Sequence, residues 1–375
     1  MISSIKKRSP FFLLFFAMAV SSVSLATCNI NNVKFDFNDV VIVPEQRSKV
    51  RSRKEINVLD ENGKLPIIVS GMDTVIDEHN YQFFLDQNIY VCIPRGIYNG
   101  DLTQNFGEAF LSLGLSEAEK MCDNNAFPQK RILVDVANGH SERVIDVAKK
   151  IKEKYGDTIE LMMGNVANPQ TYREYALLGV DWLRCGIGGG QACLTSANTG
   201  VHYPMASLVA ECYQIKAQNN FKTKIVADGG FKNFDEINKA LALGADAVML
   251  GSIFNKCIEA CGDNWILNKE TKSYIPIHDK AFAEKLFQEG VEIYKLYRGM
   301  STKQVQAKWG KKHLTTSEGI VKYNKVAYKL SGWLENFTDY LRSAMSYANA
   351  RNLGKFIGNV QYVFISQNAL SRFKK

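Results

Sequence analysis

Short apolar runs alternate with amphipathic segments along most of the chain after Cys28. Eight of the runs are predicted to be strands: Leu65–Ser70, Ile89–Ile93, Arg131–Ala137, Ile159–Val166, Asp181–Ile187, Lys224–Asp228, Ala245–Leu250 and Ile293–Arg298. Predicted helices between them include Ser141–Lys154, Pro169–Leu178, Met205–Ala217 and Phe234–Leu243. Continuous apolar strands separated by helices indicate a parallel sheet covered on both faces. Eight of them favour a closed sheet, so the pattern predicts the α/β class and a (β/α)8 TIM barrel.

One segment before the last predicted strand breaks this alternation. Within it, Trp265–Ile277 is predicted to form a hairpin, and a helix is expected near Lys280–Glu289. We interpret residues 262–292 as a small insertion into the barrel. Helices are expected again around Leu334–Ala348, and residues 29–375 are expected to form a single barrel domain.

The N-terminal segment has a different character. The basic cluster Lys6–Arg8 precedes an apolar run over Phe11–Val20, and Ser24–Ala26 resembles a signal-peptidase site. The run is too short to span a bilayer comfortably. Two interpretations of residues 1–28 therefore stay open: a secretory signal peptide, or an extension upstream of the true start, for which Met18 is a candidate.

Composition and charge limit the kinds of ligand that the chain is expected to bind. The chain has 375 residues, of which 46% are hydrophobic and 22% charged, as in ordinary globular proteins. Its net charge of +8 is spread along the sequence, which favours anionic small molecules over nucleic acid. The eight cysteines show no CxxC spacing and the five histidines are scattered, so a zinc site has little support. This cysteine usage is typical of a reduced protein, and we expect a cytoplasmic location with no membrane contact beyond the signal-like segment.

Glycines follow the C-terminal ends of several predicted strands. These turns are Asn138-Gly139-His140, Gly164-Asn165, Gly186–Cys193, Gly229-Gly230 and Gly251-Ser252. In a barrel the loops at this face carry the active site, and glycines let backbone N–H groups approach a phosphate. Any one of these glycines could be a plain turn residue, but several on one face favour a binding site.

The loop from Cys185 to Thr195 holds the most informative chemistry. It contains Gly188 and Gly190 and places Cys193 at the end of a glycine run on the expected active-site face. A cysteine in that position can act as a nucleophile when its thiolate is stabilised, and main-chain carbonyls of such a loop can hold a monovalent cation. The alternative is a buried structural thiol, which we favour for Cys185 and also for Cys193 when it is considered in isolation.

This loop, with Thr199-Gly200-Val201-x-Tyr203-Pro204 after it, resembles the active-site loop of the IMP dehydrogenase/GMP reductase family. The likeness runs from about Phe35 to the C-terminus. Its other motifs, in family order, are Phe37-Asn38-Asp39-Val40-Val41-Ile42, Met72-Asp73-Thr74-Val75, Asp135-Val136-Ala137-Asn138-Gly139, Asp228-Gly229-Gly230, Met249-Leu250-Gly251-Ser252 and Tyr297-Arg298-Gly299-Met300. The resemblance implies a TIM barrel that acts on a purine nucleotide.

Three features are similar to the reductase branch of the family. Dehydrogenases usually carry paired CBS modules after the second strand, and the interval from Ile93 to Ile132 is too short for them, so no CBS insertion is expected. The motifs that begin at Asp135 and Thr199 have reductase-like forms. The dehydrogenase activates water with an Arg-Tyr pair, and Met300–Glu318 contains neither residue. An IMP dehydrogenase without CBS modules and a non-catalytic nucleotide-binding protein remain the alternatives.

The resemblance implies a chemical role for three residues. Cys193 attacks C2 of GMP, ammonia leaves, and NADPH then reduces C2 to give IMP. Thr195 and Glu318 occupy the family's positions for the proton relay that assists the departure of ammonia. For Glu318, a solvated loop glutamate is the alternative interpretation.

The resemblance also implies a set of binding residues. Asp228 contacts the ribose hydroxyls, and the residues expected around the phosphate are Gly229, Gly230, Gly251, Ser252 and Tyr297. Those expected at the base are Gly299, Met300 and Ser301. For the cofactor NADPH the matching positions are Ser52, Arg53, Arg95, Asp135, Val136, Ala137, Ser343 and Tyr347. Ser52, Arg53, Ser343 and Tyr347 are expected to reach a neighbouring subunit, which implies a homotetramer. A potassium ion is implied at Gly188, Gly190 and Cys193.

Five residues depart from the family pattern. Gln191 stands where a serine usually contacts phosphate, and Pro94-Arg95 replaces a His-Lys pair. Thr315 stands where an arginine is expected, and Arg298 is more typical of the dehydrogenase. The chain is therefore expected to be a divergent member whose substrate contacts differ in part.

Overall fold

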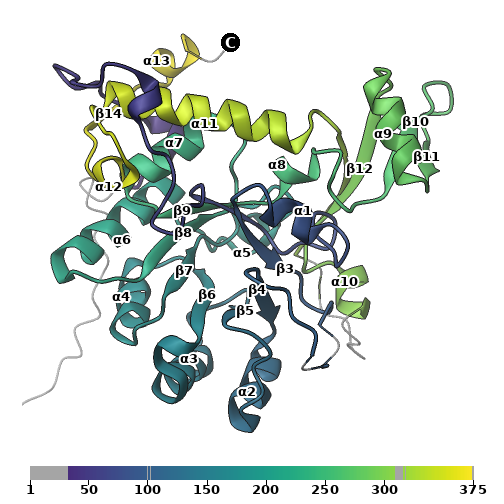
Figure 1. The fold of residues 1–375 in the computed structure, drawn as a ribbon, viewed down its shortest axis with the longest axis horizontal. Helices are drawn as coiled ribbons and strands as arrows, with labels where there is room; N and C mark the ends of the chain where they lie inside the picture. The colour runs from purple at the N-terminus through teal and green to yellow at the C-terminus, as the bar shows by residue number, and fades with distance from the viewer. Residues whose placement is uncertain (1–32, 99, 102, 309–315, 317, 374–375) are drawn as a thin grey trace, which may run out of the picture. The chain divides into compact units, whose positions relative to one another are not determined.

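Eight parallel strands close into a barrel in the computed structural model, which describes residues 33–98, 100–101, 103–308, 316 and 318–373 (Figure 1). In chain order the barrel strands are β2 (Ile67–Val69), β3 (Tyr90–Ile93), β4 (Phe110–Leu113), β5 (Arg131–Asp135), β6 (Glu160–Val166), β7 (Trp182–Cys185), β8 (Lys224–Asp228) and β9 (Ala247–Leu250). The barrel closes where β9 pairs with β2, with Val248 opposite Ile67. The predicted (β/α)8 barrel is confirmed.

Helices follow most of the barrel strands; the longer ones cover the outside of the barrel, whereas residues of α5 and α8 line the cavity at the strand ends. They are α1 (Tyr81–Leu85), α2 (Leu115–Asn124), α3 (Glu142–Tyr155), α4 (Pro169–Leu177), α5 (Thr195–Thr199), α6 (Met205–Asn219), α7 (Phe234–Leu243) and α8 (Ser252–Asn255). The four helices expected from the amphipathic pattern correspond to α3, α4, α6 and α7. Each turns an apolar face inward; in α3, for example, Val144, Val147 and Ile151 are buried.

One predicted barrel strand is wrong and one real strand was missed. Ile293–Arg298 is a strand, β12, but it belongs to a separate antiparallel sheet. Over its first four residues the side chains alternate between buried and partly buried, as expected for an antiparallel strand with one covered face. The missing barrel strand is β4, whose four residues are all buried. Ser112 interrupts its apolar run, and the run is too short to stand out from its flanks.

The separate sheet has the strand order β11-β10-β12-β13. Its other strands are β10 (Asn264–Leu267), β11 (Tyr274–Ile277) and β13 (Val321–Lys325), and α9 (Lys280–Gln288) follows the hairpin. The predicted hairpin and helix are therefore present, beside β12 in Figure 1, but they follow the last barrel strand rather than precede it. In the pairing of β12 with β13, Tyr297 lies opposite Lys322.

The remaining elements lie before the barrel or after its last strand, except η4, which lies between α3 and β6. They are η2 (Phe37–Asp39), β1 (Val40–Ile42), η3 (Arg53–Glu55), η4 (Gly156–Thr158), α10 (Lys303–Lys308), α11 (Leu330–Tyr347), α12 (Leu353–Phe356), β14 (Tyr362–Phe364) and α13 (Gln367–Ser371). Strands β1 and β14 form an antiparallel pair, and α11 corresponds to the helix expected around residues 334–348.

Aromatic side chains fill the N-terminal end of the barrel interior. Tyr90, Phe110 and Trp182 are each the first residue of their strand and are almost fully buried. The Trp182 ring packs edge-on against Tyr90 at 5.1 Å and Phe110 at 6.0 Å between ring centroids, and its Nε1 donates to Glu160 at 2.8 Å. Because this plug closes one end, open space is left at the C-terminal ends of the strands, where the glycine turns lie.

The chain divides into two units, Met1–Val33 and Lys34–Lys375. Both interpretations of residues 1–28 fall outside the described residues. In the part that is described, no helix combines the length and the apolar character needed to cross a membrane. All seven cysteines in that part are free thiols.

Candidate active site

A cavity of about 600 Å³ opens at the C-terminal ends of the barrel strands. Most of the predicted site residues line it. They come from the C-terminal ends of β3, β5, β7, β8, β9 and β12, from the segments that follow these strands, and from the segment before β13: Cys193, Thr195, Glu318, Asp228, Gly229, Gly230, Gly251, Ser252, Tyr297, Gly299, Met300, Ser301, Arg95, Asp135, Val136, Ala137, Gly188 and Gly190. The four predicted residues that do not line it are Ser52, Arg53, Ser343 and Tyr347.

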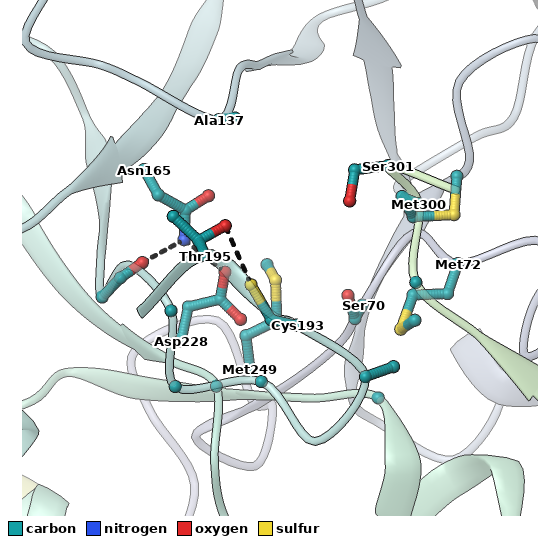
Figure 2. A pocket seen from close by; sticks show the side chains of 18 of the residues that line it. Ser70, Met72, Ala137, Asn165, Cys193, Thr195, Asp228, Met249, Met300 and Ser301 are labelled. Carbon is teal, nitrogen blue, oxygen red and sulfur yellow. Dashed lines mark hydrogen bonds between the residues drawn. The ribbon is translucent and has the colours of Figure 1, made fainter. Parts of the chain in front are cut away.

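A thiol, a hydroxyl and a carboxylate stand in series on one side of this cavity. The Cys193 thiol donates a hydrogen bond to Thr195 Oγ1, with 3.3 Å between sulfur and oxygen, and Figure 2 shows the two side chains meeting. The Thr195 hydroxyl in turn donates to Glu318 Oε2. Such a series can move a proton between the carboxylate and a group bound at the sulfur.

Backbone hydrogen bonds hold Glu318 against the cysteine loop. The Leu194 N–H donates to the Glu318 carbonyl at 2.7 Å, and the Ile320 N–H donates to the Ala192 carbonyl at 3.0 Å. These bonds make a short antiparallel bridge between Cys193 and Gly319. Residues far apart in the sequence are thereby brought to one point.

Gly299 makes this approach possible. A Cβ atom at Gly299 would lie 2.8 Å from the Ala192 carbonyl oxygen and 3.0 Å from the Gly319 Cα. Both distances are shorter than ordinary van der Waals contacts, and both neighbours are backbone. Only glycine therefore allows the segment after β12 to pack against the cysteine loop and the Glu318 segment together.

The glycine turns after β7 and β8 pack directly on each other. Gly229 and Gly230 have φ angles of +106° and +90°, a region that L side chains rarely adopt. A Cβ at Gly230 would lie 2.9 Å from the Gly189 carbonyl oxygen. The two turns consequently present backbone, not side chains, to this end of the cavity.

A buried ion-pair network underlies the cavity and was missed in the sequence. Arg184, on β7, donates from Nη1 to Asp135 Oδ1 at 2.5 Å and from Nη2 to Asp228 Oδ2 at 2.8 Å. Asn165 also donates to Asp228 Oδ2, at 2.7 Å. Burial alone would lower the pKa of the Arg184 guanidinium, but the charges of Asp228 and Asp135 raise it above its ordinary value. The signal available in the sequence was a charged residue inside a buried strand.

We expect Arg184→Met to lower the free energy of unfolding by about 3–5 kcal/mol, because two buried carboxylates would lose their shared cation. Urea denaturation of both proteins measures the change. Arg173→Met, at an exposed position of α4, is the matched control and is expected to change stability by about 0.5 kcal/mol or less. Equal stability of the two variants would show that the network contributes nothing.

The predicted cofactor residues fall into two separate groups in one chain. In the cavity, Arg95 donates from Nη1 to the Asp135 carbonyl at 3.4 Å. Outside it, Ser52 caps η3, which packs against α11, the helix that carries Ser343 and the exposed Tyr347.

The two glycine carbonyls of the predicted potassium loop already accept hydrogen bonds. Ser196 Oγ donates to the Gly188 carbonyl at 3.0 Å, and the Cys193 N–H donates to the Gly190 carbonyl at 2.9 Å. Each carbonyl oxygen retains a second lone pair, so the loop is compatible with a cation held by main-chain oxygens. Among the described residues, no group of three or more His, Cys, Asp or Glu side chains is placed to hold a metal ion.

Three of the departures from the family pattern have visible partners. Gln191 lines the cavity and accepts a hydrogen bond from Lys322 Nζ at 3.1 Å. Arg298 forms an ion pair with Asp73, with its Nε 3.1 Å from Oδ1. Arg95 lines the cavity, whereas Thr315 lies outside the described residues.

Comparison with known proteins agrees with this geometry. A family model described as IMP dehydrogenase / GMP reductase domain matches residues 129–372. The GMP reductase of Ligilactobacillus salivarius (strain UCC118) is 31% identical over 350 residues, which cover 89% of this chain and 97% of that protein. GMP reductase 1 of Homo sapiens is 30% identical over 362 residues, covering 90% and 96%. The GMP reductase of Caenorhabditis elegans is 27% identical over 366 residues, covering 90% and 93%.

Proposed function

This chain belongs to the IMP dehydrogenase/GMP reductase family, and we propose that it is a GMP reductase, which converts GMP to IMP and ammonia with NADPH as reductant. The observation that carries the proposal is the series Cys193, Thr195 and Glu318, assembled inside the cavity at the C-terminal ends of the barrel strands. The nearly full-length likeness to reductases of bacteria and animals supports the choice of this branch.

In the proposed reaction the Cys193 sulfur forms a bond to C2 of GMP. The bond from C2 to the amine then breaks, and a proton relayed by Glu318 and Thr195 leaves with the ammonia. When bound, NADPH supplies the hydride that reduces C2. The carbon–sulfur bond breaks as IMP departs, which returns the thiolate of Cys193. The overall change is GMP plus NADPH to IMP, ammonia and NADP⁺, with protons taken from solvent.

The nucleotide-binding roles that the resemblance implies are proposed here, and the contacts of the cavity wall support them. All the bonds that Arg184 and Asn165 make to Asp228 go to Oδ2, so Oδ1 is proposed to accept from the ribose hydroxyls. The backbone N–H groups of Gly229, Gly230, Gly251 and Ser252 are proposed to meet the phosphate, helped by the Tyr297 hydroxyl. Gly299, Met300 and Ser301 are proposed to meet the base.

Cofactor binding is proposed to use two copies of the chain. Arg95 and the Asp135–Ala137 segment line the cavity, while Ser52, Arg53, Ser343 and Tyr347 lie outside it. In a homotetramer, the residues outside the cavity would complete the NADPH site of a neighbouring subunit, which accounts for this division.

We also propose that a potassium ion supports the loop at Gly188, Gly190 and Cys193. The free cysteines and the need for NADPH favour the cytoplasm as the place of reaction.

A spectrophotometric assay of the purified chain tests the proposal. Oxidation of NADPH that depends on GMP, with release of ammonia, is the expected result. Reduction of NAD that depends on IMP would instead assign the chain to the dehydrogenase branch. Tight binding of GMP with neither reaction would identify a binding protein without catalysis.

A further inference from the structure

Lys322 is a cation beside the cavity that no described carboxylate neutralises. It lies on β13, is partly buried, and donates to Gln191 Oε1 at 3.1 Å. In the part of the chain that the structure describes, no acidic side chain lies within ion-pair distance of it, whereas Lys325 on the same strand is paired with Glu292. Burial, and to a smaller extent the neighbouring charge of Lys256, lower the pKa of the Lys322 ammonium, as expected for a cation with no acidic neighbour among the described residues.

Strand pairing directs the Lys322 side chain toward the cavity wall. Lys322 lies directly opposite Tyr297 in the antiparallel pairing of β13 with β12. Directly opposed residues point to the same face of a sheet, and Tyr297 lines the cavity. The ammonium of Lys322 lies 5.5 Å from the centroid of the Tyr297 ring. The ammonium of Lys322 is therefore held between two groups, the ring of Tyr297 and the amide oxygen of Gln191.

The part of the cavity beside Lys322 is the end formed by the glycine turns. Gln191 directly follows Gly190, and the loop at Gly189 packs on Gly229 and Gly230. The Tyr297 hydroxyl lies beside the Cα of Gly251, where an added Cβ would be 3.2 Å away from it. An anion cradled by these backbone turns would thus lie next to the amide that Lys322 contacts.

We propose that Lys322, held by Gln191 and Tyr297, provides the charge that recognises the 5′-phosphate of the nucleotide. A lysine is a compact cation with three donors, so it can keep its bond to Gln191 and donate to a phosphate oxygen as well. The long side chain of Gln191 acts as a positioning residue for this ammonium. This proposal rests on the proposed function because it takes GMP as the ligand. It adds a charged residue to the proposed phosphate contacts, which are otherwise neutral backbone and hydroxyl groups.

Binding of GMP and of guanosine to the full chain, measured by calorimetry without cofactor, tests this role. Lys322→Met is expected to weaken GMP binding by about ten- to a hundredfold, because a hydrogen bond between charged groups is lost, and to leave guanosine binding nearly unchanged. Lys322→Arg retains the charge and is expected to recover part of the loss. Raising the salt concentration is expected to narrow the gap between Lys322→Met and the unaltered chain.

Two further variants separate this role from a structural one. Lys325→Met, on the same strand but in an exposed ion pair, is the matched control and is expected to bind GMP normally. Gln191→Leu is expected to weaken GMP binding by less than Lys322→Met does. The double variant is expected to lose less binding free energy than the two single variants lose in sum, because both residues act through the ammonium of Lys322.

The outcomes distinguish this proposal from the proposed function. Equal loss of GMP and guanosine binding in Lys322→Met, or no loss of either, would overturn the role of Lys322. An unaltered chain that binds GMP more tightly than guanosine but oxidises no NADPH would contradict the reductase assignment and leave the role of Lys322 standing. In an active enzyme, the effect of Lys322→Met is expected mainly in the KM for GMP, with a much smaller change in kcat.

Discussion

Cys193→Ala is expected to abolish turnover of GMP while GMP still binds with nearly its original affinity. The sulfur forms the bond to C2 in the proposed reaction, and no other thiol lines the cavity in the described part of the chain. Loss of a nucleophile typically lowers kcat by about four or more orders of magnitude. Steady-state oxidation of NADPH measures the first effect, and calorimetric titration with GMP measures the second.

Cys261→Ala is the matched control for this experiment. Cys261, like Cys193, is only partly buried, but it lies outside the cavity, where its thiol contacts the Asp73 carbonyl. The kcat of the Cys261→Ala variant is expected to stay within about threefold of that of the original enzyme. Small changes away from the reacting atoms rarely alter the activation free energy by more than a fraction of a kcal/mol. Measurable turnover by Cys193→Ala at a comparable rate would show that another group attacks the purine.

Glu318→Gln is expected to lower kcat by about 10²- to 10⁴-fold, the range typical for loss of a general acid–base group. The amide has the size of the carboxylate and can still bond to the Thr195 hydroxyl, so GMP binding is expected to change little. Only the carboxylate can cycle a proton to the departing amine. Rapid-mixing measurement of ammonia release identifies the slowed step, because the deficit is expected before reduction of C2 rather than after it.

Variants of Thr195 test whether the relay passes through its hydroxyl. Thr195→Ser retains the hydroxyl and is expected to keep most of the activity. Thr195→Val removes it at similar volume and is expected to approach the rate of Glu318→Gln. Glu284→Gln, which removes a carboxylate from an exposed ion pair with Lys329, is the control for altered charge. Turnover of Glu318→Gln at the original rate would exclude the carboxylate from the mechanism.

The sequence predicted the barrel because the central residues of most strands are buried and apolar. Strand β4 escaped notice because Ser112 divides a run that is already short. Ile293–Arg298 was assigned to the wrong sheet because an apolar pattern identifies a strand but not its partner. Pairing partners depend on contacts between distant segments, and that information does not appear in local periodicity.

The same limit applies to the candidate site. Cys193 was identifiable because it ends a glycine-rich loop after a strand, and Asp228 because the motif Asp228-Gly229-Gly230 matches one of the family. Arg184 was overlooked because its partners, Asp135 and Asp228, come from other strands, and only barrel closure brings the three together. Lys322 was invisible for a related reason: its place opposite Tyr297 is set by the register of β12 and β13, which no local motif encodes.

Glu318 reaches Cys193 from outside the barrel, on a segment joined to the separate antiparallel sheet and attached to the cysteine loop through its backbone. Segments held by a few hydrogen bonds open at lower free energy than a packed core. On gradual heating, reductive activity is therefore expected to disappear at a lower temperature than the one at which the barrel melts, and to return fully on cooling from that interval. Heat would therefore first separate the carboxylate from the thiol, and the chemistry would stop while the barrel is still folded.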